Sequence, residues 1–347
     1  MIWAHSSPIL QQVRATLGRL ASVCAGTLLR SLFAVVVPLA VSSYLVAQGT
    51  NINEVHVLAR GMPSATDPRR QTVRANVDLV LVNVTVLDKA GQAVTGLQPA
   101  QFAVLDNKNP QTVRYLSNVD EPISLVVVLD ASASMAARID EVRQASSELV
   151  NTSNPHDDVA VIVVRDEPFV ALSFKDSTSE LQGTLDALRP DGATSLWDAV
   201  YLGINELKNS HFQRKAMVVI SDGGDNHSRY TEVQLKSLLQ EAGAEVYAIG
   251  MFDRYATRIE ERKGPLQLDE VTSVTGGRVL SVHDPVELSR AVAQISHELR
   301  NQYILGYYPS IRSRDGKWRR LKVKLARSAS AGKFRLYARK GYYAATE

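Results

Sequence analysis

Five side chains that can offer oxygen ligands follow predicted strand ends or lie in a predicted turn. They are Asp130, Ser132, Ser134, Thr194 and Asp222. The first three come at the end of the apolar run 124–130, the fourth lies in the turn 191–195, and the last follows the apolar run 216–221. Because open α/β sheets bind ligands beyond the carboxyl ends of their strands, we expect the five to meet at one edge of one sheet. Two carboxylates and three hydroxyls suit Mg²⁺, with Mn²⁺ or Ca²⁺ as alternatives, rather than zinc.

A cation held by few charged ligands still attracts anions, so an acidic side chain of another protein could complete its coordination. The sequence therefore predicts a protein partner that binds through the metal. The residues alone leave an alternative open, because serine and aspartate also favour helix N-termini, and Ser134 or Ser195 could simply cap the helices that follow. For the nearby oxygen donors Asp225 and Asn226 we expect a role in forming the turn.

Alternating strands and helices must position these residues. Continuous apolar runs without polar alternation are typical of strands that are covered on both faces; they cover 124–130, 159–164, 216–221 and 245–250. Helical patterns lie between and after them, at about 136–152, 178–189, 195–209, 231–242, 265–275 and 284–300, with a further strand near 278–282. This order predicts an α/β fold with an open, mostly parallel sheet wrapped by helices.

The two flanks of this region have β patterns instead. Apolar residues alternate along 80–86 in the first flank and along 321–325 and 334–339 in the second. We expect the two flanks to pack together as one small β domain. Between Arg312 and Lys340 there are twelve lysines and arginines and one acidic residue. A solvated sheet face accounts for them most simply, and a patch that binds anionic envelope polymers is the alternative.

Three segments carry a family resemblance. Val128–Met135, Gly192–Leu196 and Val219–Gly223 resemble, in this order, the metal-ion-dependent adhesion site of von Willebrand factor type A (VWA) domains. The resemblance covers about 122–300 and implies a Rossmann-like fold. It also implies that Ser132, Ser134 and Thr194 touch the metal, while Asp130 and Asp222 act directly or through water. The sequence departs from the motif at Ala133, where glycine is frequent, and this small change should leave the loop intact.

The flanks resemble those of the VWFA-related family best known from acidobacteria. The resemblance rests on Val77–Val86 with Gly96, Leu97 and Phe102, and on Tyr303–Pro309 with Gly341–Tyr343. The expected division of the chain is therefore a leader (1–47), a linker (48–72), a β-sandwich-like segment (73–121), a VWA domain (122–300) and a C-terminal β extension (301–347).

The leader pattern predicts export. Residues 1–47 hold three arginines and no acidic residue, and the apolar run 32–47 ends at Ala47, a small residue suited to cleavage. A cleaved signal peptide is expected, and an uncleaved membrane anchor is the alternative; either places the body of the protein in the periplasm, the cell envelope or the extracellular space. The one cysteine, Cys24, lies in this leader, so the remainder has no thiol for a disulfide or for zinc.

Charge and motifs disfavour other functions. The 39 basic residues fall to 36 without the leader, which equals the 36 acidic residues, so nothing indicates nucleic-acid binding. There is no Gly-x-Ser-x-Gly, Gly-x-x-x-x-Gly-Lys or Gly-x-Gly-x-x-Gly motif, and we expect no enzyme. His227 could act as a base in a metal-dependent hydrolase, but an exposed polar side chain is the expected role. A structural envelope module that the metal stiffens is the other alternative to adhesion.

Overall fold

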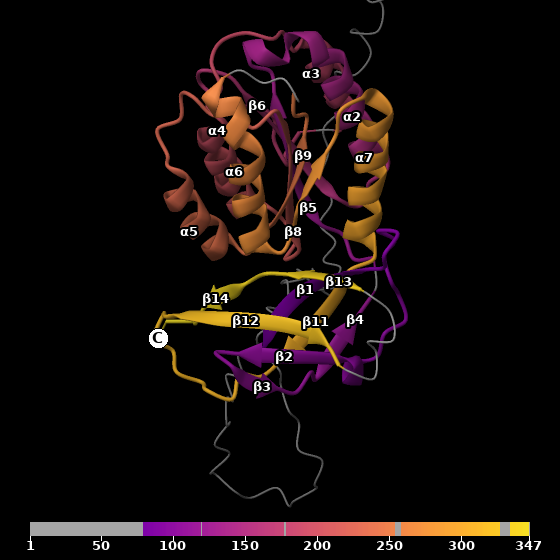
Figure 1. Cartoon of the computed structure of the whole chain (residues 1–347), viewed down its shortest axis with the longest axis vertical. Coiled ribbons are helices and arrows are strands. Elements are labelled where there is room, and N and C mark those ends of the chain that lie inside the picture. The colour runs from indigo at the N-terminus through magenta and orange to yellow at the C-terminus, as the bar shows by residue number, and fades with distance from the viewer. Residues whose placement is uncertain (1–78, 119, 177, 254–257, 327–333, 347) are drawn as a thin grey trace, which may run out of the picture. The chain divides into compact units, whose positions relative to one another are not determined.

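The computed structural model describes residues 79–118, 120–176, 178–253, 258–326 and 334–346 (Figure 1). The predicted leader and linker, 1–72, lie outside the described residues. Within these ranges, none of the helices has the length and apolar character needed to cross a membrane.

A six-stranded sheet forms the centre of the α/β region, in the order β10-β9-β8-β5-β6-β7. Its parallel strands are β5 (Ser124–Asp130), β6 (Asp158–Val164), β8 (Lys215–Ser221), β9 (Glu245–Gly250) and β10 (Val279–Ser281). The edge strand β7 (Phe169–Leu172) is antiparallel and was not predicted from the sequence. The predicted open, mostly parallel sheet is thus confirmed.

Helices cover both faces of this sheet, as Figure 1 shows. One face packs against α2 (Ile139–Asn151), α3 (Leu181–Ala187) and α7 (Pro285–Arg300). The other packs against α4 (Leu196–Glu206), α5 (Glu232–Ala242) and α6 (Ile259–Thr275). Short 3-10 helices are η1 (Pro99–Gln101), η2 (Ala133–Arg138), η3 (Thr178–Glu180) and η4 (Leu207–Asn209).

The packing of β5 on both faces explains why its sequence does not alternate between apolar and polar residues. Leu125, Val127 and Leu129 pack into the core on the α2 and α7 side, whereas Val126 and Val128 pack into the core on the α4 side. All seven residues of the strand are buried. Burial of each such side chain contributes roughly 1.5–3 kcal/mol, so both faces hold this strand in place. Asp130, its last residue, is therefore fixed at the carboxyl edge of the sheet.

Two four-stranded sheets form the β domain, in the orders β13-β1-β11-β4 and β14-β12-β2-β3. The strands before the α/β region are β1 (Val80–Leu87), β2 (Phe102–Asp106), β3 (Asn109–Gln111) and β4 (Tyr115–Ser117). Those after it are β11 (Tyr303–Tyr307), β12 (Trp318–Leu325), β13 (Arg335–Ala338) and β14 (Gly341–Tyr343). Strand β1 pairs with β11 and β13, and β12 pairs with β2, all antiparallel. Both flanks thus build one small β domain, as predicted.

Tyrosines of the C-terminal flank hold the β domain together. The hydroxyls of Tyr307 and Tyr342 both donate to Oδ2 of Asp106, at 2.9 and 2.8 Å. The Tyr303 hydroxyl accepts from the amide of Leu97 at 3.0 Å and donates to the carbonyl of Val94. Because these bonds join residues about 200 positions apart, the Tyr-rich pattern that resembles the VWFA-related family has a structural role here.

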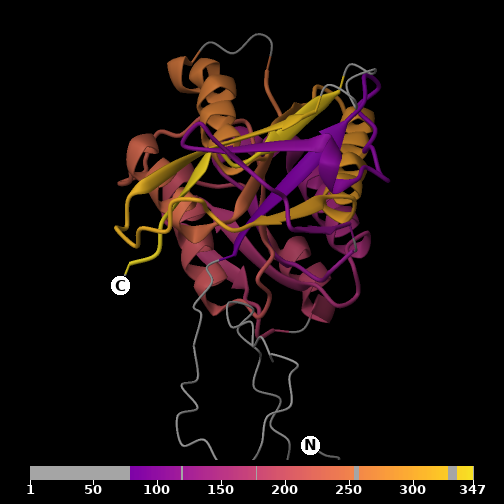
Figure 2. The ribbon, with the colours of Figure 1, turned by 90° about the horizontal axis from the view of Figure 1, so that it is seen from below.

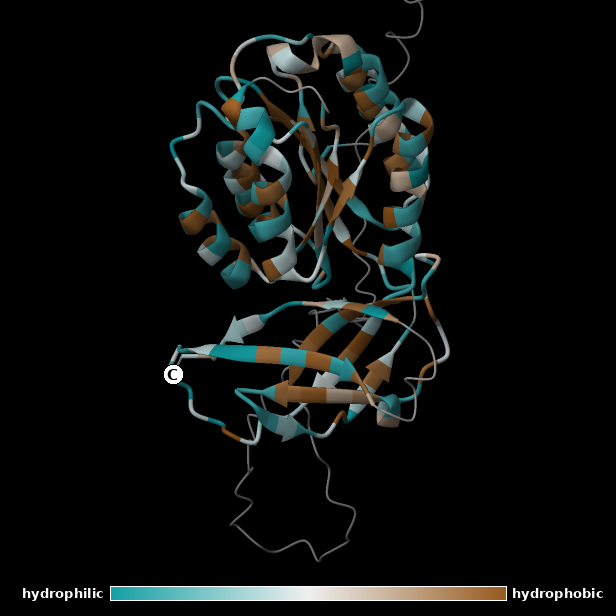
Figure 3. Cartoon of the chain, viewed as in Figure 1, coloured by the Kyte–Doolittle hydropathy of each residue, from teal (hydrophilic) through white to brown (hydrophobic). Residues whose placement is uncertain are grey.

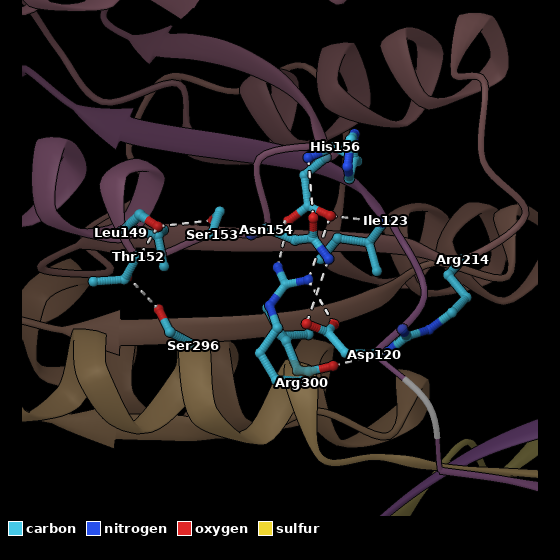
Figure 4. A network of polar contacts seen from close by, with 12 residues as sticks. Asp120, Ile123, Leu149, Thr152, Ser153, Asn154, His156, Arg214, Ser296 and Arg300 are labelled. Atoms are coloured by element: carbon cyan, nitrogen blue, oxygen red, sulfur yellow. Dashed lines mark hydrogen bonds and ion pairs between the residues drawn. The ribbon is translucent and has the colours of Figure 1, made fainter.

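Arginines fix the two connections between the α/β region and the β domain. Arg300, the last residue of α7, forms an ion pair with Asp120 (Figure 4) and a second one with the buried carboxylate of Asp157. Arg214 donates to the carbonyls of Glu121 and Leu299, at 2.7 and 2.8 Å. Each arginine thus ties the segment that enters β5 to the segment that leaves α7.

A buried polar cluster lies where β9 begins, at the edge of the central sheet opposite to Asp130. The Nε2 of Gln302 donates to Glu245 at 2.6 Å and to Thr85 of β1 at 3.1 Å. The Tyr247 hydroxyl donates to the other Glu245 oxygen at 3.2 Å. Burial raises the pKa of Glu245 to about 7. The described part of the β domain therefore contacts the amino-terminal edge of the sheet, whereas Asp130 lies at the carboxyl edge (Figure 2 views the chain from the β-domain side).

Candidate metal-binding site

Asp130 has a fully buried carboxylate, and no basic side chain of the described residues forms a hydrogen bond with it. Its Oδ1 accepts from the amide of Ser132 at 3.0 Å, and its Oδ2 accepts from the hydroxyl of Ser221 at 2.5 Å. Burial and, to a smaller extent, the charge of Asp222 together raise the pKa of Asp130 to about 6, although the hydrogen bonds from Ser132 and Ser221 oppose this rise. A positive charge beside this carboxylate would stabilise its ionised form and lower its pKa, which would offset the effects of burial and of Asp222.

The hydroxyls of Ser132 and Ser134 lie 3.1 Å apart in the loop that follows Asp130. Ser132 is buried and Ser134 is exposed, so the pair reaches from the strand end to the surface. Neither hydroxyl caps a helix: the N-cap of α2 is Arg138, and Ser132, the N-cap of η2, makes no side-chain capping bond. Ser195 is the N-cap residue of α4, as the capping alternative expected, but its hydroxyl donates to the carbonyl of Asp166 and makes no capping bond.

The loop that carries Thr194 is held against the Asp130 loop. The amide of Ala133 donates to the carbonyl of Gly192, and the amide of Asp191 donates to the carbonyl of Ala131, both at 3.0 Å. Gly192 has a φ of +76°, a conformation that favours glycine, and this turn brings Thr194 to the sheet edge. Thr194 itself is 3% exposed, and no hydrogen bond of its hydroxyl occurs within the described part of the chain.

The segment after Asp222 braces the Thr194 loop from the other side. Oδ1 of Asn226 accepts from the amide of Thr194 at 2.9 Å, and the amide of Asn226 donates back to the Thr194 carbonyl at 3.0 Å. Oδ1 of Asp225 accepts from the amide of Leu196, and the Ser228 hydroxyl accepts from the amide of Trp197. Asp225 and Ser228 therefore cap α4 from a distant loop, which goes beyond the turn-forming role expected for Asp225 and Asn226.

Asp222 follows β8 directly and is half-buried. Its Oδ1 accepts from the amide of Gly224 at 3.0 Å. Helix α6 crosses this turn so closely that a Cβ on Gly264 would lie 2.7 Å from the Asp222 carbonyl oxygen, and one on Gly223 would lie 2.8 Å from the Cα of Gly264. Because Gly223 and Gly264 have no Cβ, α6 can pack directly against the Asp222 turn and support it.

Ser221 is a site residue that the sequence reasoning missed. Its hydroxyl donates to Asp130 and accepts from the amide of Gly223 at 2.9 Å, so it joins the ends of the neighbouring strands β5 and β8. A polar residue at the end of an otherwise apolar strand, directly before Asp222, was the available signal.

The five predicted residues therefore come from three adjoining loops at the carboxyl edge of the sheet. They fit a hard divalent cation, because all five can offer oxygen atoms. Within the described ranges there is no group of three or more His, Cys, Asp or Glu side chains that could hold a metal. A cation at this edge would therefore rely on hydroxyls beside the two carboxylates. His227 has an exposed side chain, and its amide donates to the Thr194 carbonyl.

Residues 125–224 match the family model of the von Willebrand factor type A domain. The chain therefore carries a VWA domain, and the matched segment contains Asp130, Ser132, Ser134, Thr194 and Asp222.

Among known proteins, an uncharacterized protein of Borreliella burgdorferi is 22% identical over 195 residues, which are 50% of this chain and 57% of that protein. Among solved structures, the PilB minor pilin from Streptococcus sanguinis has 16% identity and a TM-score of 0.43, over 53% of this chain and 63% of that one. The vWF domain of the type V pili tip protein Mfa5 from Porphyromonas gingivalis has 14% identity and a TM-score of 0.43, over 51% and 95%. The chain thus spans less than two thirds of the first two proteins, and at these identities none of the three assigns a function to it.

Proposed function

We propose that this protein binds a divalent cation, with Mg²⁺ preferred over Mn²⁺ or Ca²⁺, at Asp130, Ser132, Ser134, Thr194 and Asp222, and through it an acidic side chain of a protein partner. The observation that carries the proposal is the buried Asp130 carboxylate, which lies near Asp222 and whose hydrogen-bond partners among the described residues, Ser132 and Ser221, carry no positive charge. Burying a charge without a counter-charge is costly, and a cation would supply the missing one.

Each residue has a distinct task in this proposal. Asp130 is held by Ser132 and Ser221, and it places negative charge at the strand end. Ser132 and Ser134 offer neutral oxygens 3.1 Å apart, and the Thr194 loop offers a third. When bound, the cation would supply a positive centre that can take a carboxylate from outside. Neutral ligands would leave most of its charge for that carboxylate.

The location and the non-enzymatic character belong to the same proposal. The basic, acid-free leader with its apolar run supports export to the periplasm, the envelope or the extracellular space. The exposed position of His227, and the capping and bracing roles of the polar residues around Thr194, support a site for binding rather than for hydrolysis.

Calorimetric titration with MgCl₂, MnCl₂ and CaCl₂ tests the metal site. We expect the wild type to bind Mg²⁺, and Ser134→Ala and Asp130→Asn to bind it at least about tenfold more weakly, since each removes an oxygen ligand or its charge. Ser134 is exposed, so this variant should fold normally. Ser237→Ala, an exposed serine of α5, is the matched control and should bind like the wild type. No binding of any of the three cations by the wild type would refute the proposal.

Capture experiments separate adhesion from the structural alternative. Wild type and Ser134→Ala are incubated with envelope extract in Mg²⁺ or in EDTA, and the retained proteins are identified. Adhesion predicts a partner that is lost in EDTA, returns with Mg²⁺ and is retained less by Ser134→Ala. Metal binding with a raised melting temperature, but with retention that EDTA does not change, would instead assign the cation a stiffening role.

A further inference from the structure

The outer face of the sheet β14-β12-β2-β3 carries a row of cations. Along β12, Arg320, Lys322 and Lys324 are exposed, whereas Leu321 between them is buried in the core of the β domain. Figure 3 shows this alternation of hydrophilic and hydrophobic residues along the strand. Because residues two apart on a strand are separated by about 7 Å, the three charges form a straight, evenly spaced row.

Among the residues that the structure describes, no ion pair neutralises this row. Register places Arg320 opposite Gly341, Lys322 opposite Leu105 and Lys324 opposite Ala103. Within the described residues none of the three forms an ion pair. Two acidic residues on or beside these strands have other partners: Asp106 is buried and accepts from two tyrosines, and Asp315 pairs with Arg319. The row therefore presents uncompensated positive charge to solvent.

An aromatic platform stands at one end of the row. Trp318 lies on the same face of β12, two residues before Arg320, and packs edge-on against Tyr343 of β14 with 5.0 Å between the ring centroids. A Cβ on Gly341 would lie 2.2 Å from the indole, so the ring lies directly over the backbone of β14. Glycine at 341 thus lets a large apolar ring surface lie along the sheet instead of projecting from it.

We propose that this face binds a linear anionic polysaccharide of the cell envelope. The polymer would lie along β12, with a sugar ring on Trp318 and successive acid groups on Arg320, Lys322 and Lys324. A single row of charges along one strand suits a chain whose own charges repeat along its length. A lipid surface fits less well, because Tyr343 is the only exposed large apolar side chain of this sheet in the described part of the protein. The choice of an envelope polymer over nucleic acid rests on the proposed export.

This surface is separate from the proposed metal site. The β domain contacts the amino-terminal edge of the central sheet, through Gln302, Thr85 and Glu245, whereas Asp130 lies at the carboxyl edge. Polysaccharide binding should therefore not need a divalent cation.

Binding of the full-length protein to polygalacturonate, measured in EDTA and at low salt, tests the proposal. We expect the triple variant Arg320→Gln, Lys322→Gln, Lys324→Gln to lose at least about tenfold in affinity, and Trp318→Leu to weaken binding at unchanged net charge. The control is Lys89→Gln, Lys175→Gln, Arg262→Gln, three exposed residues outside this face that give the same change in net charge. This control should bind like the wild type, and neutral dextran should not bind.

Three results would overturn the proposal. An equal loss in the two triple variants would mean that net charge alone causes binding. The wild type could also bind single-stranded DNA or phosphatidylglycerol vesicles more tightly than polygalacturonate. If the β12 triple variant then lost that binding, the face would belong to another kind of partner. Binding that occurs in Mg²⁺ but not in EDTA would place the polysaccharide at the metal site. That result would leave the proposed function standing, because metal affinity is measured separately.

Discussion

Asp130 shows how much of a site lies outside its motif. Residue type and spacing predicted Asp130, Ser132, Ser134, Thr194 and Asp222, because a strand end followed by alternate hydroxyls can be recognised along the chain. The residues that hold them were not predicted. Ser221 reaches Asp130 across 91 positions, and Asn226 reaches Thr194 across 32. Such bonds depend on how loops meet in space, which local spacing does not contain.

At the scale of single residues, we predict that Asp225→Ala destabilises the protein. The change leaves the amide of Leu196 and the hydroxyl of Ser228 without their acceptor, and the loss of a helix cap costs about 1–2 kcal/mol. Since α4 follows Thr194 directly, Mg²⁺ affinity should fall as well. Urea unfolding and calorimetric titration measure the two effects. Asp225→Asn keeps an oxygen acceptor and should lose much less; equal losses in both variants would show that the charge, and not the cap, matters.

At the scale of elements, the sequence predicted the buried strands and most helices, because continuous apolar runs and 3.6-residue periodicity are local signals. Within the α/β region, two elements differ from the prediction. Strand β7 has only four residues, too few for a clear alternation. Helix α6 was expected over 265–275, but it begins at Ile259 and includes Pro265. The additional first turns of this helix include Gly264, which packs against the Asp222 turn.

We predict that Gly264→Ala is destabilising although alanine normally favours helices. An added Cβ would lie 2.7 Å from the Asp222 carbonyl oxygen, and the overlap should cost roughly 1–3 kcal/mol and weaken Mg²⁺ binding. Gly183→Ala in α3 is the matched control, because a Cβ there meets nothing within 4 Å and should stabilise the helix by roughly 0.5–1 kcal/mol. Thermal melts and Mg²⁺ titrations of both variants check this. A Gly264→Ala protein as stable as the Gly183→Ala protein would contradict the close approach.

At the scale of the whole molecule, the two ends of the central sheet have different environments. The carboxyl edge holds the candidate site, and the amino-terminal edge is joined to the β domain through the buried Glu245, Gln302 and Thr85. The sequence predicted that both flanks join in one β domain, because both have strand patterns. It did not predict this cluster, since a single glutamate that begins an apolar strand gives no sign of its partners.

Glu245 should make stability depend on pH. Its pKa rises from 4.5 to about 7 in the folded protein, so between these values the folded protein holds a proton that the unfolded chain releases. This contribution to stability is fully present below pH 4.5 and is lost as the pH rises through about 7, by about 3 kcal/mol. Glu245→Gln cannot ionise and should gain stability relative to wild type over this range. Urea unfolding across the range measures the difference, with the exposed Glu241→Gln as control; parallel profiles of Glu245→Gln and wild type would contradict it.

The pairing of β1 with β11 also has a consequence for biosynthesis. Val80 pairs with Tyr307, so β1 has to wait for more than 200 further residues before its neighbour is synthesised. The strands and helices from β5 to α7 pair within a contiguous stretch and can form first, because nearby segments meet at a smaller loss of chain entropy. During that interval β1 has an unpaired backbone edge, and its apolar side chains Val82, Val84 and Val86 are uncovered. Both features favour aggregation. We therefore expect a newly made chain to need chaperone protection chiefly at its first strands, until the last strands have been synthesised.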